Sequence, residues 1–252
     1  MSKTILITGA GSGMGRLAAI ELARRGHDVI ATVERPDQVG ELSSAQPELT
    51  VAKLDITDDG DVATLDQWDV DVLINNAGYS RIGPISRMPM ELIRRTFEIN
   101  VFGTIAVTQR VVARMKEKGS GRVMIVSSVA GLRAGPYSSP YSMSKHALQA
   151  FGGSLRGELA PLGIDVALIN PGPFGTGFND AMFDTLQDWW DRDTAPPHEV
   201  ALFDGLKQRI TVGQLDPADA AKVYADLAEA ETTELVNPIP ADILQQFADH
   251  GR

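Results

Sequence analysis

The sequence predicts one α/β domain built on a doubly wound, mainly parallel sheet with helices on both faces. Two observations predict it. Short apolar runs alternate with helical patterns along the chain, which is typical of strand–helix–strand units. Most of these runs are continuously apolar, as expected for strands covered on both faces of a parallel sheet. The chain has 252 residues and no repeat, linker or low-complexity tract, so we assign residues 1–252 to a single domain.

The individual elements follow from these patterns. Strands are expected at residues 3–8, 27–33, 49–55, 71–77, 122–128 and 164–170, with 233–239 as the candidate for a seventh. Helices are expected at residues 14–25, 58–67, 89–118 and 140–160. Pro89 suits the first turn of the long third helix, where a missing N–H costs nothing. Parallel strands joined by helices imply right-handed crossovers.

Composition excludes several classes of protein. The chain has no cysteine, which excludes disulfides and thiolate metal sites. Its formal charge of −10 argues against nucleic acid as a partner. We find no apolar run of membrane-spanning length and no signal peptide, so we expect a cytoplasmic protein that does not bind membranes. The four histidines share no ligand spacing, and we expect no metal site.

The segment TILITGAGSGMG, residues 4–15, places four glycines where a strand should end and a helix begin. A helix N-terminus presents unpaired N–H groups and a partial positive charge, to which a dinucleotide pyrophosphate can bind if no side chain blocks it. The spacing that fits is Gly9-x-x-x-Gly13-x-Gly15, preceded by Thr8. A plain strand–helix connection remains the alternative for this turn taken alone.

The end of the second expected strand bears on the choice of cofactor. Glu34 could accept hydrogen bonds from the adenosine ribose hydroxyls and repel a 2′-phosphate. The next residue, Arg35, could instead attract a 2′-phosphate. A solvated acid–base pair in a turn is the alternative for both residues.

A second group of polar residues lies in SSVAGLRAGPYSSPYSMSKHAL, residues 127–148. Tyr141 and Lys145 are four residues apart on an expected helix and therefore share a face. A nearby ammonium should lower the pKa of the phenol and make it a proton donor or acceptor near neutral pH. Ser128 ends the preceding strand, at the sheet edge where doubly wound folds bind ligands.

Together these residues resemble the classical short-chain dehydrogenase/reductase family, whose fold is a Rossmann-type seven-stranded sheet. The resemblance runs in order to about residue 177. It rests on TGAGSGMG, on NNAG at residues 75–78, on Asn100 in FEINVFG, on Ser128, Tyr141 and Lys145, on NPGPFGT at residues 170–176, and on Asp55 in KLDIT.

The resemblance implies a role for each candidate. Tyr141 exchanges a proton with the substrate oxygen while a hydride moves to or from nicotinamide, Lys145 holds the nicotinamide ribose, and Ser128 stabilises charge on the substrate oxygen. Asn100 would hold a water that links Lys145 to solvent. The implied cofactor contacts are Gly9, Ser12, Gly13, Met14, Gly15, Glu34, Asp55, Ile56, Asn76, Ala77, Gly78, Tyr141, Lys145, Pro171, Gly172 and Thr176.

We therefore expect an oxidoreductase that interconverts secondary alcohols and ketones. NAD is the preferred cofactor because Glu34 follows the second strand and Ser12 stands where members that use NADP often have a basic residue; Arg35 leaves NADP possible. Two alternatives are a dinucleotide-binding sensor or scaffold without turnover, and an epimerase or dehydratase on the same fold.

Residues 174–213 correspond to the variable substrate loop of the family. Their aromatic and aliphatic residues predict an apolar lid and a hydrophobic substrate, although such residues also serve simply to pack a lid onto the body. Arg81, Arg87 and Arg133 could reach its rim or be solvated surface charges. Gly152 and Gly153, inside an expected helix, indicate close packing either against a partner subunit in a dimer or tetramer or against the sheet.

Overall fold

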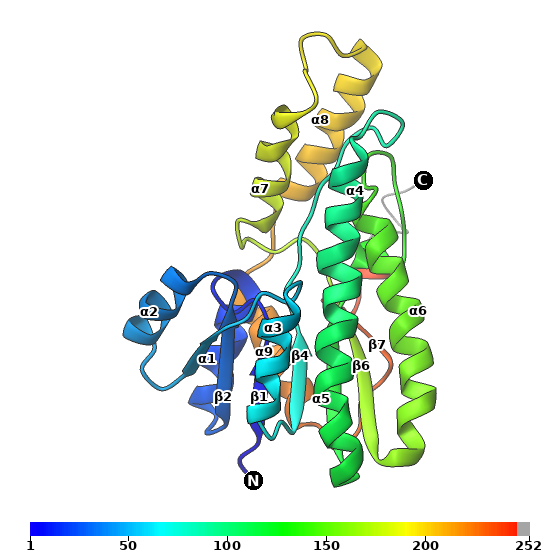
Figure 1. Cartoon of the computed structure of the whole chain (residues 1–252). Helices are drawn as coiled ribbons and strands as arrows, with labels where there is room; N and C mark the ends of the chain where they lie inside the picture. The colour runs from blue at the N-terminus through cyan, green and yellow to red at the C-terminus, as the bar shows by residue number, and fades with distance from the viewer. Residues whose placement is uncertain (246–252) are drawn as a thin grey trace.

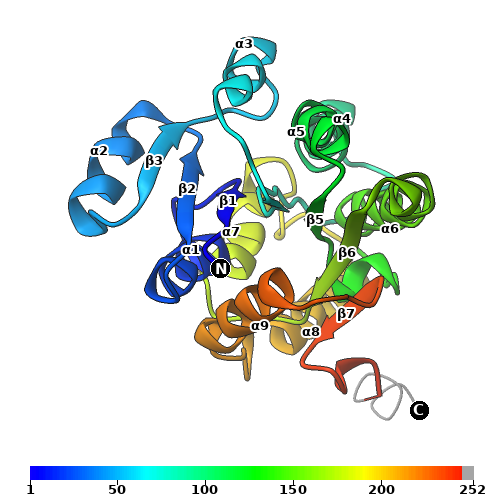
Figure 2. The same ribbon diagram turned by 90° about the horizontal axis from the view of Figure 1, so that it is seen from below.

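The computed structural model describes residues 1–245 and contains a single seven-stranded sheet in the order β3-β2-β1-β4-β5-β6-β7. Every strand pair is parallel, as Figures 1 and 2 show. The strands are β1 (Thr4–Ile7), β2 (Asp28–Val33), β3 (Thr50–Lys53), β4 (Val72–Asn75), β5 (Gly121–Val126), β6 (Ile164–Pro171) and β7 (Val236–Ile239). All seven expected runs contain a strand, so the predicted doubly wound fold is confirmed.

The helices are α1 (Gly13–Arg24), α2 (Pro36–Ala45), α3 (Asp59–Ala63), α4 (Met90–Phe97), α5 (Thr104–Lys118), α6 (Tyr141–Leu159), α7 (Phe178–Asp184), α8 (Pro197–Thr211) and α9 (Pro217–Glu229). The long helix expected at 89–118 is α4 and α5 joined by a π-helical turn, Glu98–Gly103. Such wider turns are frequent at functional sites. The sequence analysis did not predict α2 or α9, nor the helices α7 and α8 within residues 174–213.

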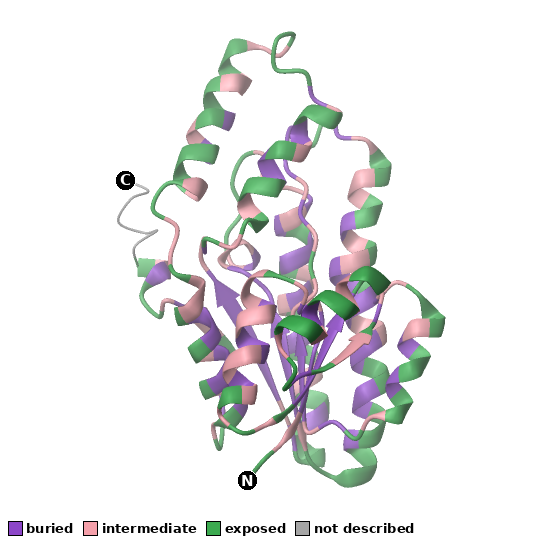
Figure 3. Cartoon of the chain, turned by 90° about the vertical axis from the view of Figure 1, so that its left-hand side faces the viewer, coloured by how far each residue is buried: buried purple, intermediate pink, exposed green. Residues whose placement is uncertain are grey.

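Each strand sends alternate side chains into two separate cores, because neighbouring residues of a strand point to opposite faces. Ile5 and Ile7 of β1 join one core, under α1, α2 and α9, whereas Leu6 joins the other, under α3, α5 and α6. Figure 3 shows the strands buried along most of their length and the outer faces of the helices exposed. This double burial explains why the strands read as continuous apolar runs.

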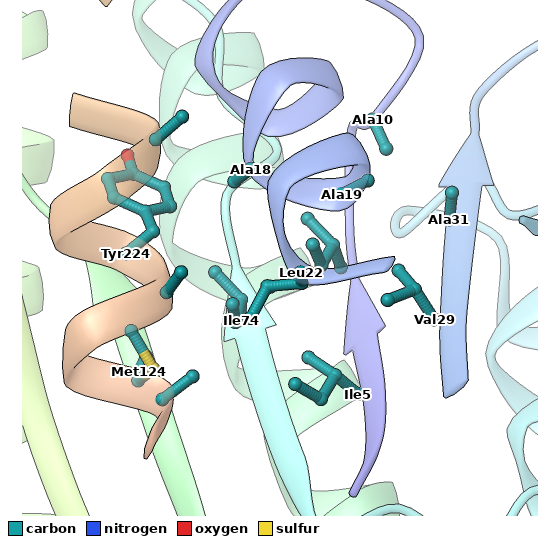
Figure 4. Close-up of a cluster of buried hydrophobic side chains, with 14 of the residues drawn as sticks. Ile5, Ala10, Ala18, Ala19, Leu22, Val29, Ala31, Ile74, Met124 and Tyr224 are labelled. Atoms are coloured by element: carbon teal, nitrogen blue, oxygen red, sulfur yellow. The ribbon is translucent and has the colours of Figure 1, made fainter. Parts of the chain in front are cut away.

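The contact between α1 and α9 closes the first core. Ala18, a small residue of α1, lets α9 approach closely, and Tyr224 of α9 packs beside it with its ring fully buried (Figure 4). The Tyr224 hydroxyl lies 3.9 Å from the Met14 sulfur at the start of α1. The helix that follows the glycine turn is thereby fixed against the sheet.

Gly152 and Gly153 of α6 lie in different surroundings. A Cβ on Gly152 would lie 2.8 Å from Leu168 of β6, so this glycine permits the helix to approach the sheet of its own chain. Gly153 is exposed, and a Cβ there would meet nothing within 4 Å. The packing of α6 against β6 therefore accounts for Gly152.

Residues 174–213, which we call the α7–α8 segment, stand above the carboxyl ends of the strands (Figure 1). They form a third apolar cluster of their own, with Met182, Leu186, Trp190 and Phe203 among its buried members. Ile82, from the loop after β4, is the buried residue of the body that joins this cluster. The segment therefore packs largely on itself, while its first residue, Phe174, joins the core under α1 and α9.

Candidate active site

The glycine turn between β1 and α1 is required first by the chain itself. A Cβ on Gly9, whose φ is +66°, would lie 2.7 Å from the backbone of Ala77. A Cβ on Gly15 would lie 2.3 Å from Asn76 Nδ2 and 2.7 Å from the Gly9 carbonyl oxygen. Two of the glycines thus allow the loop after β4 to cross directly over the turn after β1.

Hydrogen bonds hold these two loops together. Thr8 Oγ1 accepts from the backbone N–H groups of Asn76 and Ala77, both at 3.0 Å. Asn76 Nδ2 donates in return to the carbonyl oxygens of Thr8, at 3.0 Å, and Gly9, at 3.1 Å. These hydrogen bonds therefore join the carboxyl ends of β1 and β4 into one rigid unit. The two strands flank the point at which the strand order of the sheet reverses.

The N-terminus of α1 has the properties of an anion site. Ser12 is the N-cap but makes no side-chain capping bond, and none of the described residues of the first turn is acidic. A Cβ on Gly13, whose φ is +56°, would lie 3.3 Å from Thr176 Cβ. The N-terminus of α1, with Thr176 next to Gly13, therefore offers N–H groups and a helix dipole that favour a phosphate.

The ends of β2 and β3 carry the other expected cofactor residues. Glu34 is exposed directly after β2, and Arg35 forms a two-bond ion pair with Asp37. Asp55 Oδ1 accepts from the N–H of Thr57 at 2.9 Å and from its hydroxyl at 2.7 Å. Burial would raise the pKa of Asp55, but these hydrogen bonds outweigh it and the pKa is lowered. Ile56, next to it, is buried.

Ser128, Tyr141 and Lys145 converge at the carboxyl ends of the strands. Ser128 follows β5, and Tyr141 is the first residue of α6. Lys145, one turn later, lies with its Nζ 5.6 Å from the centre of the Tyr141 ring and donates to the Val126 carbonyl at 2.8 Å. A side-chain hydrogen bond links Tyr141 to Ser128. A hydroxyl, a phenol and an amine thus share one site.

The pKa values differ from the expectation that an ammonium would lower the pKa of the tyrosine. Burial raises the pKa of Tyr141 to about 12, and the hydrogen bond to Ser128 opposes only part of that rise. Burial also lowers the pKa of Lys145 to about 7. Desolvation disfavours the charged form of each group, so Lys145 is itself a titrating group near neutral pH and not a fixed positive charge.

Asn100 lies in the π-helical turn and is fully buried. Its Nδ2 donates to the Tyr79 carbonyl at 2.8 Å and to Ser144 Oγ at 2.9 Å, and its Oδ1 accepts from the Tyr79 N–H at 2.7 Å. Ser144 Oγ donates to the carbonyl of Tyr141 at 2.8 Å. The Asn100 side chain therefore ties the loop after β4 to α6, and one lone pair of Oδ1 is left for a further donor.

The sequence analysis missed a second set of polar residues around these groups. Asn170, at the end of β6, is fully buried and donates through Nδ2 to the Ser128 carbonyl at 3.0 Å. Ser127 Oγ donates to the Lys145 carbonyl at 3.1 Å and accepts from Gln149 Nε2 at 3.0 Å. Asn170 precedes the Pro171–Gly172 turn at the end of a strand, so its position could have identified it as a site residue. No feature of the sequence around Gln149 could have identified that residue.

The α7–α8 segment contributes an aromatic wall. Phe178, the first residue of α7, has its ring centre 6.0 Å from that of Tyr141. A Cβ on Gly83, whose φ is +136°, would lie 2.5 Å from Trp189, so Gly83 allows the segment to rest on the body. The three arginines expected near this rim differ: Arg81 lies over the Tyr79 ring at 4.4 Å, Arg87 pairs with Glu199 of α8, and Arg133 is exposed.

Two kinds of site are absent from residues 1–245. No helix there combines the length and apolarity needed to cross a bilayer. In the same part of the chain, no three acidic or histidine side chains gather as a metal ion would require.

Comparison with known proteins agrees with this geometry. The family model described as short chain dehydrogenase matches residues 3–187. The chain is 42% identical over 185 residues to the uncharacterized oxidoreductase YusZ of Bacillus subtilis, covering 69% of this chain and 66% of that protein, just under two thirds. It is 33% identical over 246 residues to retinol dehydrogenase 8 of Bos taurus, covering 88% of this chain and 76% of the relative.

Solved structures share the fold. A short-chain dehydrogenase from Streptomyces avermitilis superposes with a TM-score of 0.84 at 29% identity, covering 99% of this chain and 93% of the other. A short chain dehydrogenase/reductase from Burkholderia phymatum, solved in complex with NAD, gives a TM-score of 0.78 at 25% identity, with the same coverage of 99% and 93%. Another relative, 33% identical over 184 residues (68% of this chain, 65% of the relative), is the NADPH-dependent 3-dehydrocapnine reductase of Ornithobacterium rhinotracheale.

Proposed function

The chain belongs to the short-chain dehydrogenase family, whose members are oxidoreductases that use a nicotinamide cofactor, and from that premise we propose that it interconverts a secondary alcohol and a ketone. The observation that carries the proposal is the convergence of Ser128, Tyr141 and Lys145 at the carboxyl edge of the sheet, the edge at which α1 also begins after β1. Proton-transfer groups and a phosphate-binding helix end are both needed for hydride transfer, and here they share one edge of the sheet.

The residues present fit a dinucleotide. Gly13, Met14 and Thr176 would hold its pyrophosphate. Asp55 and Ile56 would contact its adenine. The loop of Asn76, Ala77 and Gly78 would lie beside its ribose groups. Pro171 and Gly172 would lie beside the nicotinamide. When bound, the cofactor supplies or accepts the hydride.

Tyr141 supplies or removes the proton. During reduction, its hydroxyl donates a proton to the ketone oxygen as negative charge develops there, and Ser128 Oγ donates a hydrogen bond to the same oxygen. During oxidation, the phenolate takes the alcohol proton. Because burial raises the pKa of Tyr141 to about 12, the protonated form that reduction needs is the resting form at neutral pH.

We propose NAD as the cofactor. Glu34 stands after β2, where a carboxylate accepts ribose hydroxyls and repels a 2′-phosphate. Arg35, which could attract that phosphate, is engaged by Asp37 in the structure. The NAD complex of the Burkholderia phymatum relative supports this choice, whereas the NADPH-dependent relative shows that the family accommodates both.

We propose a hydrophobic substrate, with the α7–α8 segment as its lid. Phe178 faces Tyr141 at 6.0 Å and would form an apolar wall next to the reacting oxygen. The name of one relative, retinol dehydrogenase 8, is consistent with an apolar alcohol as substrate. A phosphorylated sugar would find this wall unfavourable because it offers no compensating hydrogen bonds.

The test is to follow reduced-nicotinamide absorbance across a panel of aryl, alicyclic and phosphorylated alcohols and ketones with both cofactors. The Tyr141→Phe substitution should lower turnover by at least about a hundredfold and leave cofactor affinity nearly unchanged. Normal activity in that variant would refute the mechanism. Turnover confined to sugar phosphates would refute the substrate class.

We also propose that α5 and α6 carry the contact between copies of the chain, in a dimer or tetramer. Met143, Ala150 and Gly157 recur every seven residues on α6 and are all exposed, and Phe102 is 55% exposed at the start of the neighbouring helix. A seven-residue repeat of this kind suits helix–helix packing. Sedimentation should give an oligomer that Ala150→Glu dissociates; a wild-type monomer at micromolar concentration would contradict the proposal.

A further inference from the structure

The side chain of Asn170, near the end of β6, is fully buried but only half satisfied. Its Nδ2 donates to the Ser128 carbonyl oxygen at 3.0 Å, whereas its Oδ1 has no hydrogen-bond partner among the described residues. The Ser128 carbonyl also accepts from the Gly131 N–H at 2.9 Å, so it would stay paired without the amide. A buried amide with an unpaired oxygen, bonded to a carbonyl that already has a donor, adds little to stability. The stability of the fold therefore does not explain the asparagine.

β6 holds the backbone of Ser128 on both sides. On the amino side, the N–H of Ser127 donates to the Ile169 carbonyl oxygen at 2.8 Å. On the carboxyl side, the Ser128 carbonyl is bonded to β6 through Asn170 Nδ2. Ser128 itself has an extended backbone, with φ of −175° and ψ of 163°. Without the amide of Asn170, the peptide that follows Ser128 would lose this bond to β6.

The direction of the Ser128 hydroxyl depends on this backbone. Its Oγ accepts from the Ala130 N–H at 3.1 Å and donates to the Pro171 carbonyl oxygen at 3.4 Å. A hydroxyl has one proton, and 3.4 Å is long for a hydrogen bond between two oxygens. The proton is therefore held weakly and can turn to another acceptor beside Tyr141, with which Ser128 also shares a hydrogen bond.

We propose that Asn170 is a positioning residue: it fixes Ser128 so that Oγ can turn its proton from the Pro171 carbonyl to the substrate oxygen without moving. This inference rests on the proposed function, in which Ser128 donates a hydrogen bond to that oxygen. The bond strengthens as negative charge develops in the transition state, so a misplaced Oγ lowers the rate more than it lowers substrate affinity. Asn170 acts through Ser128 and need not touch the substrate.

The test uses two substitutions of similar size. Asn170→Leu can neither donate nor accept a hydrogen bond. Asn170→Asp cannot donate while its carboxylate is ionised, but the protonated acid can donate to the Ser128 carbonyl, and burial should raise the pKa of the new carboxyl group. The matched control is Asn237→Leu, because Asn237 of β7 is half-buried and donates to another carbonyl of β6, that of Leu168, at 3.1 Å.

Thermal unfolding separates positioning from a structural role. Asn170→Leu should keep Tm within about 3 °C of the wild type or raise it, because the unpaired Oδ1 is removed and the Ser128 carbonyl keeps its bond from Gly131. Asn237→Leu should lower Tm, because Asn237 bonds two carbonyl oxygens. A larger fall in Tm for Asn170→Leu than for the control would mean that Asn170 serves the fold, and would overturn the proposal.

The direct readout is hydrogen exchange of the Ala130 amide, followed by NMR in cofactor-free protein, because this N–H donates to Ser128 Oγ. Exchange should quicken by at least about fivefold in Asn170→Leu, toward the rate in Ser128→Ala, and stay within about twofold in Asn237→Leu. In Asn170→Asp it should approach the wild-type rate at the same pH as the pH falls from about 8 to about 5. Equal protection in wild type and Asn170→Leu would overturn the proposal, as would no recovery in Asn170→Asp.

Turnover is the second readout. Asn170→Leu should lower kcat by at least about tenfold and leave KM and cofactor Kd within about threefold. In a Ser128→Ala background the same substitution should change kcat by less than about twofold. An equal loss in both backgrounds would overturn the proposal, because Asn170 would then act independently of Ser128; weaker cofactor binding with unchanged kcat would overturn it in favour of a cofactor contact. If the wild type turns over no alcohol or ketone, the proposed function fails, while exchange and unfolding still decide the role of Asn170.

Discussion

Replacing Gly15 by alanine should destabilise the protein although it places a better helix former inside α1. The new Cβ would lie 2.3 Å from Asn76 Nδ2 and 2.7 Å from the Gly9 carbonyl oxygen. Asn76 must move, and its two hydrogen bonds to Thr8 and Gly9, of 3.0 and 3.1 Å, are then lost. The backbone at Gly9 can move less, because its φ of +66° and its contact with Ala77 fix it.

The magnitude follows from these contacts. Two lost hydrogen bonds cost about 1–3 kcal/mol and crowding about 1–3 kcal/mol, while the better helix propensity of alanine returns about 1 kcal/mol. We expect the free energy of unfolding to fall by about 3 kcal/mol, measured by urea denaturation. The matched control is Gly40→Ala, which should raise it by about 0.5–1 kcal/mol because only helix propensity changes there.

A double substitution separates the two contacts. In an Asn76→Ala background the clash with Nδ2 is absent, so Gly15→Ala should cost less than in the wild type. A Gly15→Ala protein as stable as the wild type would refute the reasoning, because the two loops would then have room that the structure does not show. So would an equal cost in both backgrounds.

Three further predictions concern the candidate site and the α7–α8 segment. Lys145 should make the free energy of unfolding increase between about pH 7 and 10.5, because in that range the unfolded chain binds a proton that the folded protein has lost. The increase should be roughly 1 kcal/mol per pH unit. It should be absent in Lys145→Met when unfolding is measured across the same range. Gly83→Ala should loosen the α7–α8 segment, since its Cβ would lie 2.5 Å from Trp189; tryptophan fluorescence should red-shift, and an unchanged spectrum would contradict this. Glu34→Ala should move the ratio of kcat/KM for NAD and NADP by about tenfold toward NADP, and an unchanged ratio would show that the acid does not face the ribose.

The strands were the part of the fold that the sequence predicted best. Burial on both faces makes most of them continuously apolar. The helices α2 and α9 were missed for opposite reasons. Only Leu42 of α2 is buried, so the helix has almost no apolar face, whereas α9 buries mainly alanines, whose small side chains give a weak periodic signal.

The candidate site was predicted in its members but not in its electrostatics. Residue types and spacing placed Ser128, Tyr141 and Lys145 at one edge of the sheet, and the structure brings them together there. The direction of the Tyr141 and Lys145 pKa shifts depends on how far each group is withdrawn from water, which spacing does not encode. The glycine turn was interpreted as room for a ligand, while the crossing of two loops accounts for Gly9 and Gly15.

The separate apolar cluster of the α7–α8 segment has a consequence for how such an enzyme can diversify. The family model ends at residue 187, inside this segment, so it includes Met182 and Leu186 of the cluster but not Phe203. Replacements among Met182, Leu186 and Phe203 would repack the α7–α8 segment without disturbing either core beneath the helices. Selection for new substrates could therefore act on a few dozen residues while the machinery for moving protons and hydrides is inherited intact.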